Sequence, residues 1–210
     1  MTTKTTKTRK TSHKESLSDH IYKHSPIKRG IVVKNEDKPL HKYNKIMSKI
    51  YLGNVQACKD KEIFKDCRFK AVLNCSKDIP NTFMCSKVKK GNETLEAIEY
   101  LRIPIDDSLK EIDFEKAYLM MPLAVEFIHK HAVILKQNIL IHCWAGRQRS
   151  AIMIAAYLVA KCGFTPKQAC RLIAQKRPES WHHSQGINFE TSLEKYYKDL
   201  QKGKKRSIKK

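Results

Sequence analysis

Long apolar segments are missing from this 210-residue sequence. No window approaches the ~18 uninterrupted apolar residues of a membrane-spanning helix, and the polar N-terminus has no apolar stretch that could act as a signal peptide. We therefore expect an intracellular protein, cytoplasmic, nuclear or both, without a transmembrane segment.

Paired cysteine motifs are also missing. The seven cysteines are an odd number, and no two of them form a Cys-x-x-Cys pair. Outside a secretory context, such cysteines indicate packed, reduced thiols rather than a disulfide framework or a zinc site. We expect no metal and no cofactor.

Positive charge, in contrast, is abundant, with a formal net charge of +21. Residues 1–44 contribute +7 and residues 201–210 contribute +6, which leaves +8 for the chain between them. The partition predicts a basic, disordered N-terminal extension over 1–44, a folded domain over 45–200 and a basic tail over 201–210. Such tails suit nucleic acid or another polyanion, although many are only solvated chain ends.

Hydrophobic periodicity predicts alternating strands and helices. Short apolar runs that end in turn residues predict strands over 49–54, 71–76, 98–105 and 138–143. Helical spacing predicts helices over 114–137, 150–163, 165–178 and 188–200, and we expect Pro122 to kink or split the first of them. This order indicates an α/β fold with a small central sheet of about four to five strands, flanked by helices.

One segment, "ILIHCWAGRQRSAIMIAAYL" (139–158), places Cys143 between a predicted strand and a predicted helix. Backbone N–H groups converge at a helix N-terminus and the helix dipole is positive there, which favours a thiolate and a bound anion. Gly146 permits a tight turn, and Arg149 can bind two phosphate oxygens with its planar guanidinium. The pattern predicts a phosphate site that contains its own nucleophile.

"HCWAGRQRS" resembles the His-Cys-x5-Arg-Ser/Thr signature of the cysteine-dependent protein tyrosine phosphatases. "IYLGN", "AVLNCS" and "YLRIPIDD" are similar to segments of the compact dual-specificity branch, and the resemblance covers about residues 45–200. That length is too short for the classical phosphotyrosine-specific domain. The resemblance therefore implies a shallow pocket and activity on phosphotyrosine, phosphoserine and phosphothreonine in proteins.

The same resemblance implies roles for individual residues. Cys143 would be the nucleophile that forms a cysteinyl-phosphate, Arg149 the clamp of the transition state, and Ser150 the hydroxyl that eases departure of the thiolate. His142 would organise the loop and tune the sulfur. The phosphate-binding loop would consist of Trp144, Ala145, Gly146, Arg147, Gln148 and Arg149.

A general acid is also needed, because expulsion of an unprotonated alkoxide is slow. Asp106 and Asp107 are both candidates. In the Ile-Pro-x-x-Asp pattern of the resembled branch, the acid is the fifth residue, which favours Asp107. Trp144 and Arg147 would flank the pocket mouth, where an indole can stack on a substrate and a guanidinium can attract negative charge, unless Trp144 packs against the helices.

Three alternatives to a protein phosphatase remain. The loop "CWAGRQRSA" is similar to that of the mitochondrial phosphatidylglycerophosphate phosphatases, which makes a lipid phosphate a candidate substrate. The high positive charge and Trp144 suit an RNA 5′-phosphate. A catalytically inactive phospho-binding module would keep the anion site and lack turnover.

Cys75 ends the strand predicted next to that of Cys143. When peroxide oxidises Cys143, the two cysteines could form a protective disulfide. The alternative for Cys75 is a buried structural cysteine. The sequence gives no prediction of the oligomeric state.

Overall fold

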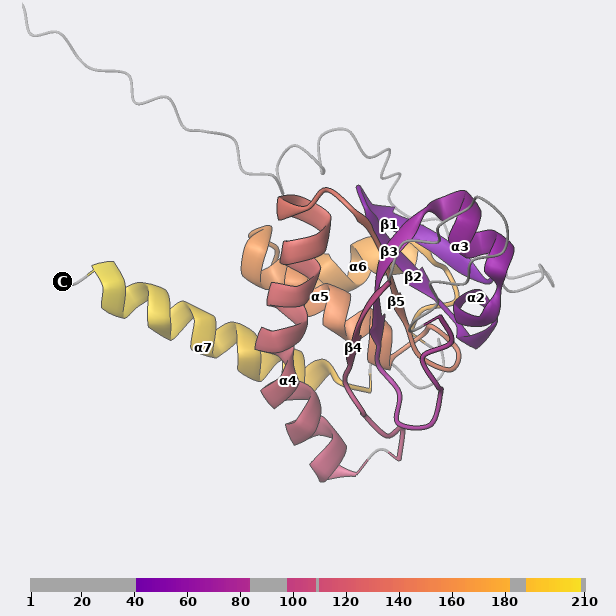
Figure 1. The fold of residues 1–210 in the computed structure, drawn as a ribbon. Coiled ribbons are helices and arrows are strands. Elements are labelled where there is room, and N and C mark those ends of the chain that lie inside the picture. Colours follow the sequence, from indigo (N-terminus) through magenta and orange to yellow (C-terminus); the bar gives the residue numbers. More distant parts are fainter. Residues whose placement is uncertain (1–40, 84–97, 109, 182–187, 209–210) are drawn as a thin grey trace, which may run out of the picture.

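The computed structural model describes residues 41–83, 98–108, 110–181 and 188–208. Within these ranges five strands form one sheet in the order β1-β2-β5-β3-β4 (Figure 1). The β1 strand is antiparallel to β2 and all other neighbours are parallel. The strands are β1 (Tyr43–Met47), β2 (Ile50–Gly53), β3 (Phe69–Asn74), β4 (Glu99–Arg102) and β5 (Asn138–His142).

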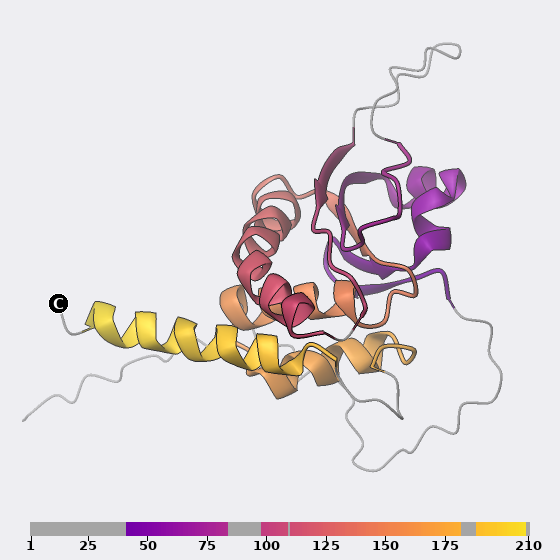
Figure 2. The ribbon, with the colours of Figure 1, turned by 90° about the horizontal axis from the view of Figure 1, so that it is seen from below.

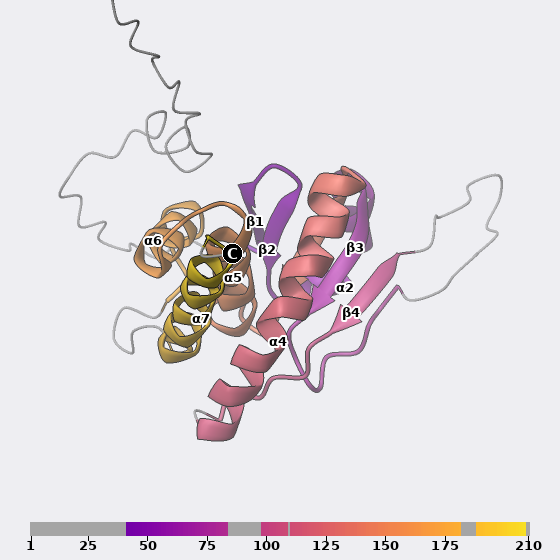
Figure 3. The same cartoon turned by 90° about the vertical axis from the view of Figure 1, so that its left-hand side faces the viewer.

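Helices cover both faces of the sheet, which confirms the α/β fold (Figure 2). Two short helices, α2 and α3, lie on one face, and the longer α4, α5, α6 and α7 lie on the other, where α4 lies beside α5 and α7 (Figure 3). The helices are α2 (Val55–Lys59), α3 (Lys61–Cys67), α4 (Glu111–His129), α5 (Arg149–Lys161), α6 (Pro166–Lys176) and α7 (Glu190–Ile208), and α4 continues as a π-helix, η1 (Lys130–Ile134).

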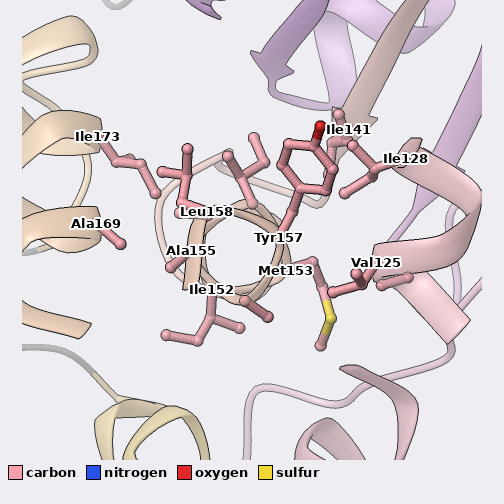
Figure 4. Packing of buried hydrophobic residues seen from close by; sticks show 14 of the residues in the cluster. Val125, Ile128, Ile141, Ile152, Met153, Ala155, Tyr157, Leu158, Ala169 and Ile173 are labelled. Carbon is pink, nitrogen blue, oxygen red and sulfur yellow. The ribbon is translucent and has the colours of Figure 1, made fainter. Parts of the chain in front are cut away.

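The core is built around α5, in which every residue from Ser150 to Val159 is buried. Figure 4 shows side chains of α4, α6 and β5, among them Ile128, Ile173 and Ile141, around this helix. A helix that is apolar all round must be enclosed by other elements. The enclosure fixes the N-terminus of α5, where the predicted anion site begins.

The helix α4 is not split at Pro122, contrary to one form of the expectation. Pro122 lies on the exposed side of α4. The carbonyl that loses its hydrogen-bond partner to a proline can bind water there, and the packed face of the helix is preserved.

The chain is folded slightly beyond the expected limits of the domain. Tyr43 and Asn44 belong to β1 and not to the N-terminal extension, and α7 continues to Ile208 inside the segment predicted as a tail. The disorder expected for residues 1–40 lies outside the described residues. None of the helices in the described ranges is long and apolar enough to cross a membrane.

Candidate active site

Three loops meet at one edge of the sheet, because β5, β3 and β4 are parallel neighbours whose carboxyl ends lie together. They surround a pocket of about 270 Å³. Its lining residues are Ser76, Asp78, Ile79, Asp106, Asp107, Ser108, Trp144 and Arg149. The predicted residues Asp107, Trp144 and Arg149 therefore converge on one site.

Cys143 lies directly after β5, with only 2% of its surface exposed. Its Sγ accepts a hydrogen bond of 3.2 Å from Oγ of Ser150, a buried residue in the first turn of α5. A hydroxyl donor at the N-terminus of a helix stabilises negative charge on the sulfur. The predicted pair of nucleophile and hydroxyl is thus in contact.

The turn of the loop depends on Gly146, which has a φ of +66°. A Cβ at this position would lie 2.4 Å from the carbonyl oxygen of Gly53, at the end of β2. The loop is also held by the N–H of Val55, which donates to the Trp144 carbonyl at 2.9 Å. Only glycine satisfies both the backbone angle and the close approach.

Arg177, which the sequence did not reveal as a site residue, holds the same loop from behind. Its fully buried guanidinium donates from Nε to the Gly146 carbonyl at 2.8 Å and from Nη2 to the Ala145 carbonyl at 3.3 Å. Nη1 donates to the Asn44 side chain of β1 at 2.6 Å. Arg177 therefore joins the loop after Cys143 to the edge strand β1.

The two candidate acids have different partners. Oδ2 of Asp107 lies 3.4 Å from Nε of Arg149, whereas Oδ2 of Asp106 lies 3.7 Å from Nζ of Lys77. Arg149 also donates from Nη1 to the Ile105 carbonyl at 3.2 Å, so the guanidinium joins the acid-bearing loop to α5.

The acid-bearing loop is anchored by Asp113, a second residue that the sequence did not reveal. Its buried carboxylate accepts hydrogen bonds from the backbone N–H and the Oγ of Ser108. Asp113 lies in the first turn of α4. The backbone just after Asp106 and Asp107 is therefore fixed to a long helix.

Of the predicted loop residues, only Trp144 and Arg149 are among the described residues that line the pocket, and His142, Arg147 and Gln148 are not. Burial lowers the pKa of His142 to about 4, so its imidazole is neutral at neutral pH. Gln148 is buried and accepts from the N–H of Asn188, which ties the loop to the start of α7. Arg147 is half-buried, and the Trp144 indole is 63% exposed at the pocket mouth rather than packed against the helices.

Cys75 follows β3, as Cys143 follows β5, and the residues before them, Asn74 and His142, are register partners. The Cys75 N–H donates to the His142 carbonyl at 2.8 Å. Cys75 is fully buried, and burial raises its pKa well above the ordinary value for a thiol. In the described ranges, no group of three or more His, Cys, Asp or Glu side chains could hold a metal ion.

Comparisons with known proteins agree with this geometry. The family model "Dual specificity phosphatase, catalytic domain" matches residues 50–199. The chain is 30% identical over 148 residues to dual specificity protein phosphatase Mpk3 of Drosophila melanogaster, covering 69% of this chain and 33% of the relative. It is 27% identical over 123 residues to human phosphatidylglycerophosphatase and protein-tyrosine phosphatase 1, covering 56% of this chain and 55% of the relative.

Among solved structures, human DUSP28 has the same fold, with a TM-score of 0.63 at 20% identity over 79% of this chain and 99% of that one. The chain spans about a third of the length of Mpk3 and less of some other curated relatives. The match to the catalytic domain nevertheless extends over most of the sequence. The chain belongs to the dual specificity phosphatase family.

Proposed function

We propose that this protein is a phosphatase that hydrolyses phosphotyrosine, phosphoserine and phosphothreonine in proteins through a cysteinyl-phosphate. The observation that carries the proposal is a pair of contacts at the start of α5: Ser150 donates to the Cys143 sulfur, and Arg149 lies 3.4 Å from Asp107 and lines the same pocket as that carboxylate. Nucleophile, anion clamp and acid are the parts that phosphoryl transfer to sulfur requires. The family model and the curated relatives support the same reaction class.

In the first step the Cys143 thiolate attacks phosphorus and the bond from phosphorus to the substrate oxygen breaks. Asp107 donates a proton to that oxygen, which leaves as an alcohol or phenol. Arg149 binds two equatorial oxygens of the transferring group, and its contact with Asp107 places the acid beside the leaving oxygen.

In the second step a water molecule attacks phosphorus and gives a proton to Asp107. The phosphorus–sulfur bond breaks, and the electron pair returns to Cys143 as a thiolate. The Ser150 hydroxyl, 3.2 Å from the sulfur, stabilises this charge.

A lipid substrate is the second candidate, because one relative is named as both a phosphatidylglycerophosphatase and a protein-tyrosine phosphatase. Hydrolysis of an RNA 5′-phosphate and binding of phosphate without turnover are the other two hypotheses from the sequence.

The proposal also includes an intracellular location and a role of the basic tails in binding a polyanion.

The test compares Cys143→Ser with Cys67→Ser, a matched change at the end of α3. We expect Cys143→Ser to abolish turnover and Cys67→Ser to retain it, and Arg149→Lys to lose at least about 100-fold because lysine lacks the planar fork. Phosphotyrosyl and phosphoseryl peptides, phosphatidylglycerophosphate and a triphosphorylated RNA end are assayed side by side. Turnover that survives Cys143→Ser would refute the mechanism, and preference for the lipid or RNA would refute the protein substrate.

A further inference from the structure

The mouth of the pocket carries more carboxylates than the reaction needs. Asp78 and Asp106 line it together with Asp107, and Arg149 is the only cation among the described residues that line it. Once phosphate is bound, Arg149 is neutralised by it and Asp107 carries the proton for the leaving group. Asp78 and Asp106 are then the charged groups that remain among the described lining residues, and the exposed Lys77 lies 3.7 Å from Asp106. Arg147, which the sequence predicted at the mouth, is not among those lining residues.

The backbone that carries Asp78 is held firmly in the loop 76–81. Asn74, fully buried at the end of β3, donates from Nδ2 to the Ile79 carbonyl at 2.8 Å. Arg102 of β4 donates from Nη1 to two carbonyls of the loop, at 2.9 and 3.1 Å. A charge on an ordered loop costs little conformational entropy when a ligand binds.

Trp144 lies at the same mouth. Its indole is 63% exposed, while its backbone carbonyl is fixed by the N–H of Val55. The face of an indole attracts cations, and so does a carboxylate. Together Trp144 and Asp78 have the chemistry that binds an ammonium or guanidinium group next to the phosphate site.

We propose that this rim selects phosphoprotein segments with Lys or Arg beside the phosphorylated residue, and that Asp78 and Trp144 contact the cationic side chain. The proposal rests on the proposed function. The positive charge of the whole chain does not cancel the effect, because charges beyond a Debye length of about 8 Å are screened at physiological ionic strength. Segments with a second phosphate or acidic flanks are disfavoured by the same carboxylates.

The test uses phosphotyrosyl peptides that are identical except for Arg, Ala or Glu on both sides of the phosphotyrosine. We expect kcat/KM of the wild-type protein to be about threefold to tenfold higher for the Arg than for the Glu peptide, from one exposed ion pair and one exposed cation–π contact. The ratio should shrink at high salt. Asp78→Asn and Trp144→Ala should each lower the ratio, and Asp78→Lys should reverse it.

The ratio is measured within each variant, so it does not depend on the amount of active protein. Asp66→Lys on α3, whose residue is not among those that line the pocket, is the matched control and should keep the wild-type ratio. An equal rate for the Arg and Glu peptides, or a ratio that Asp78→Lys leaves unchanged, would overturn the rim proposal alone. If the protein hydrolysed p-nitrophenyl phosphate and the lipid or RNA substrate but none of the peptides, the rim proposal and the proposed protein substrate would both be overturned.

Discussion

Asp107 lies against Arg149, with Oδ2 of the carboxylate 3.4 Å from Nε of the guanidinium. The adjacent Asp106 faces Lys77 instead. One of two neighbouring carboxylates therefore lies beside the residue proposed to bind the phosphate, and the other lies beside an exposed lysine. This difference separates their expected roles in catalysis.

We expect Asp107→Asn to slow the hydrolysis of alkyl phosphates by at least about 100-fold and that of activated aryl phosphates far less, because only poor leaving groups need a proton. Asp106→Asn should affect both substrate classes to the same extent. The measurement is kcat for p-nitrophenyl phosphate and for a phosphoseryl peptide. Equal slowing of the two substrates by Asp107→Asn would remove its role as the acid.

Gly146→Ala should disrupt the loop that is proposed to bind phosphate. The new Cβ would meet the Gly53 carbonyl at 2.4 Å, and the φ of +66° is strained for any side chain. We expect a loss of about 3 kcal/mol or more in the free energy of unfolding, together with loss of activity. Gly203→Ala in α7, where a Cβ meets nothing within 4 Å, should instead stabilise by up to about 1 kcal/mol. Urea denaturation measures both changes in the free energy of unfolding. A Gly146→Ala protein with wild-type stability would contradict the expected clash with Gly53.

Arg177→Lys should impair catalysis even in folded protein, because an ammonium cannot bind the Gly146 and Ala145 carbonyls with the geometry of a guanidinium. We expect at least about a tenfold loss in kcat/KM and slower alkylation of Cys143 by iodoacetate at pH 6. Arg171→Lys, an exposed position on α6, is the matched control. Wild-type alkylation and kinetics in a folded Arg177→Lys protein would show that the contact is structural only.

The lowered pKa of His142 predicts that the folded protein loses stability in acid. Its pKa is about 4 in the folded protein and near 6.5 in the unfolded chain, so the unfolded chain binds the proton more tightly. The stabilisation is complete above pH 6.5 and is lost at about 1.4 kcal/mol per pH unit as the pH falls toward 4. In urea denaturation between pH 6.5 and 4, the free energy of unfolding of His142→Asn should fall less steeply with decreasing pH than that of the wild-type protein, by about 1.4 kcal/mol per pH unit. Carboxylates such as Glu99 contribute alike to both proteins, and identical slopes would contradict the prediction.

The proposed redox pair of Cys75 and Cys143 predicts a reversible inactivation. Peroxide converts the Cys143 thiolate to a sulfenic acid, and Cys75 displaces water from it to form the disulfide. Because burial raises the pKa of Cys75, this closure should be slow. In Cys75→Ser the sulfenic acid has no cysteine to trap it and further peroxide oxidises it to sulfinic acid, so after prolonged peroxide treatment less activity should return with dithiothreitol than in the wild-type protein. Mass spectrometry that finds no Cys75–Cys143 linkage in the wild-type protein would dispose of the idea.

The sequence by itself determined the elements that carry strong local signals. The start of α6 follows from Thr165, which forms a capping box with Gln168 and is followed by Pro166. Leu193 and Tyr196 are buried on α7 and Phe189 is buried just before it, inside the segment 188–200 whose apolar spacing predicted a helix. The loop from Cys143 to Ser150 was predicted in the same way, because an apolar strand, a glycine turn and a helix start are local features.

Only the tertiary structure decided which distant side chains complete the site. The strand β1 was not predicted because an antiparallel edge strand such as "YNKIM" has a weak apolar pattern. Arg177 reads as the end of a helix in the sequence, and its contact with Gly146 joins residues 31 positions apart. The roles of Asp78 and Asp107 likewise depend on loops that meet because β3, β4 and β5 are parallel neighbours. Local patterns specify elements, whereas packing of the sheet and helices sets which charges face one another.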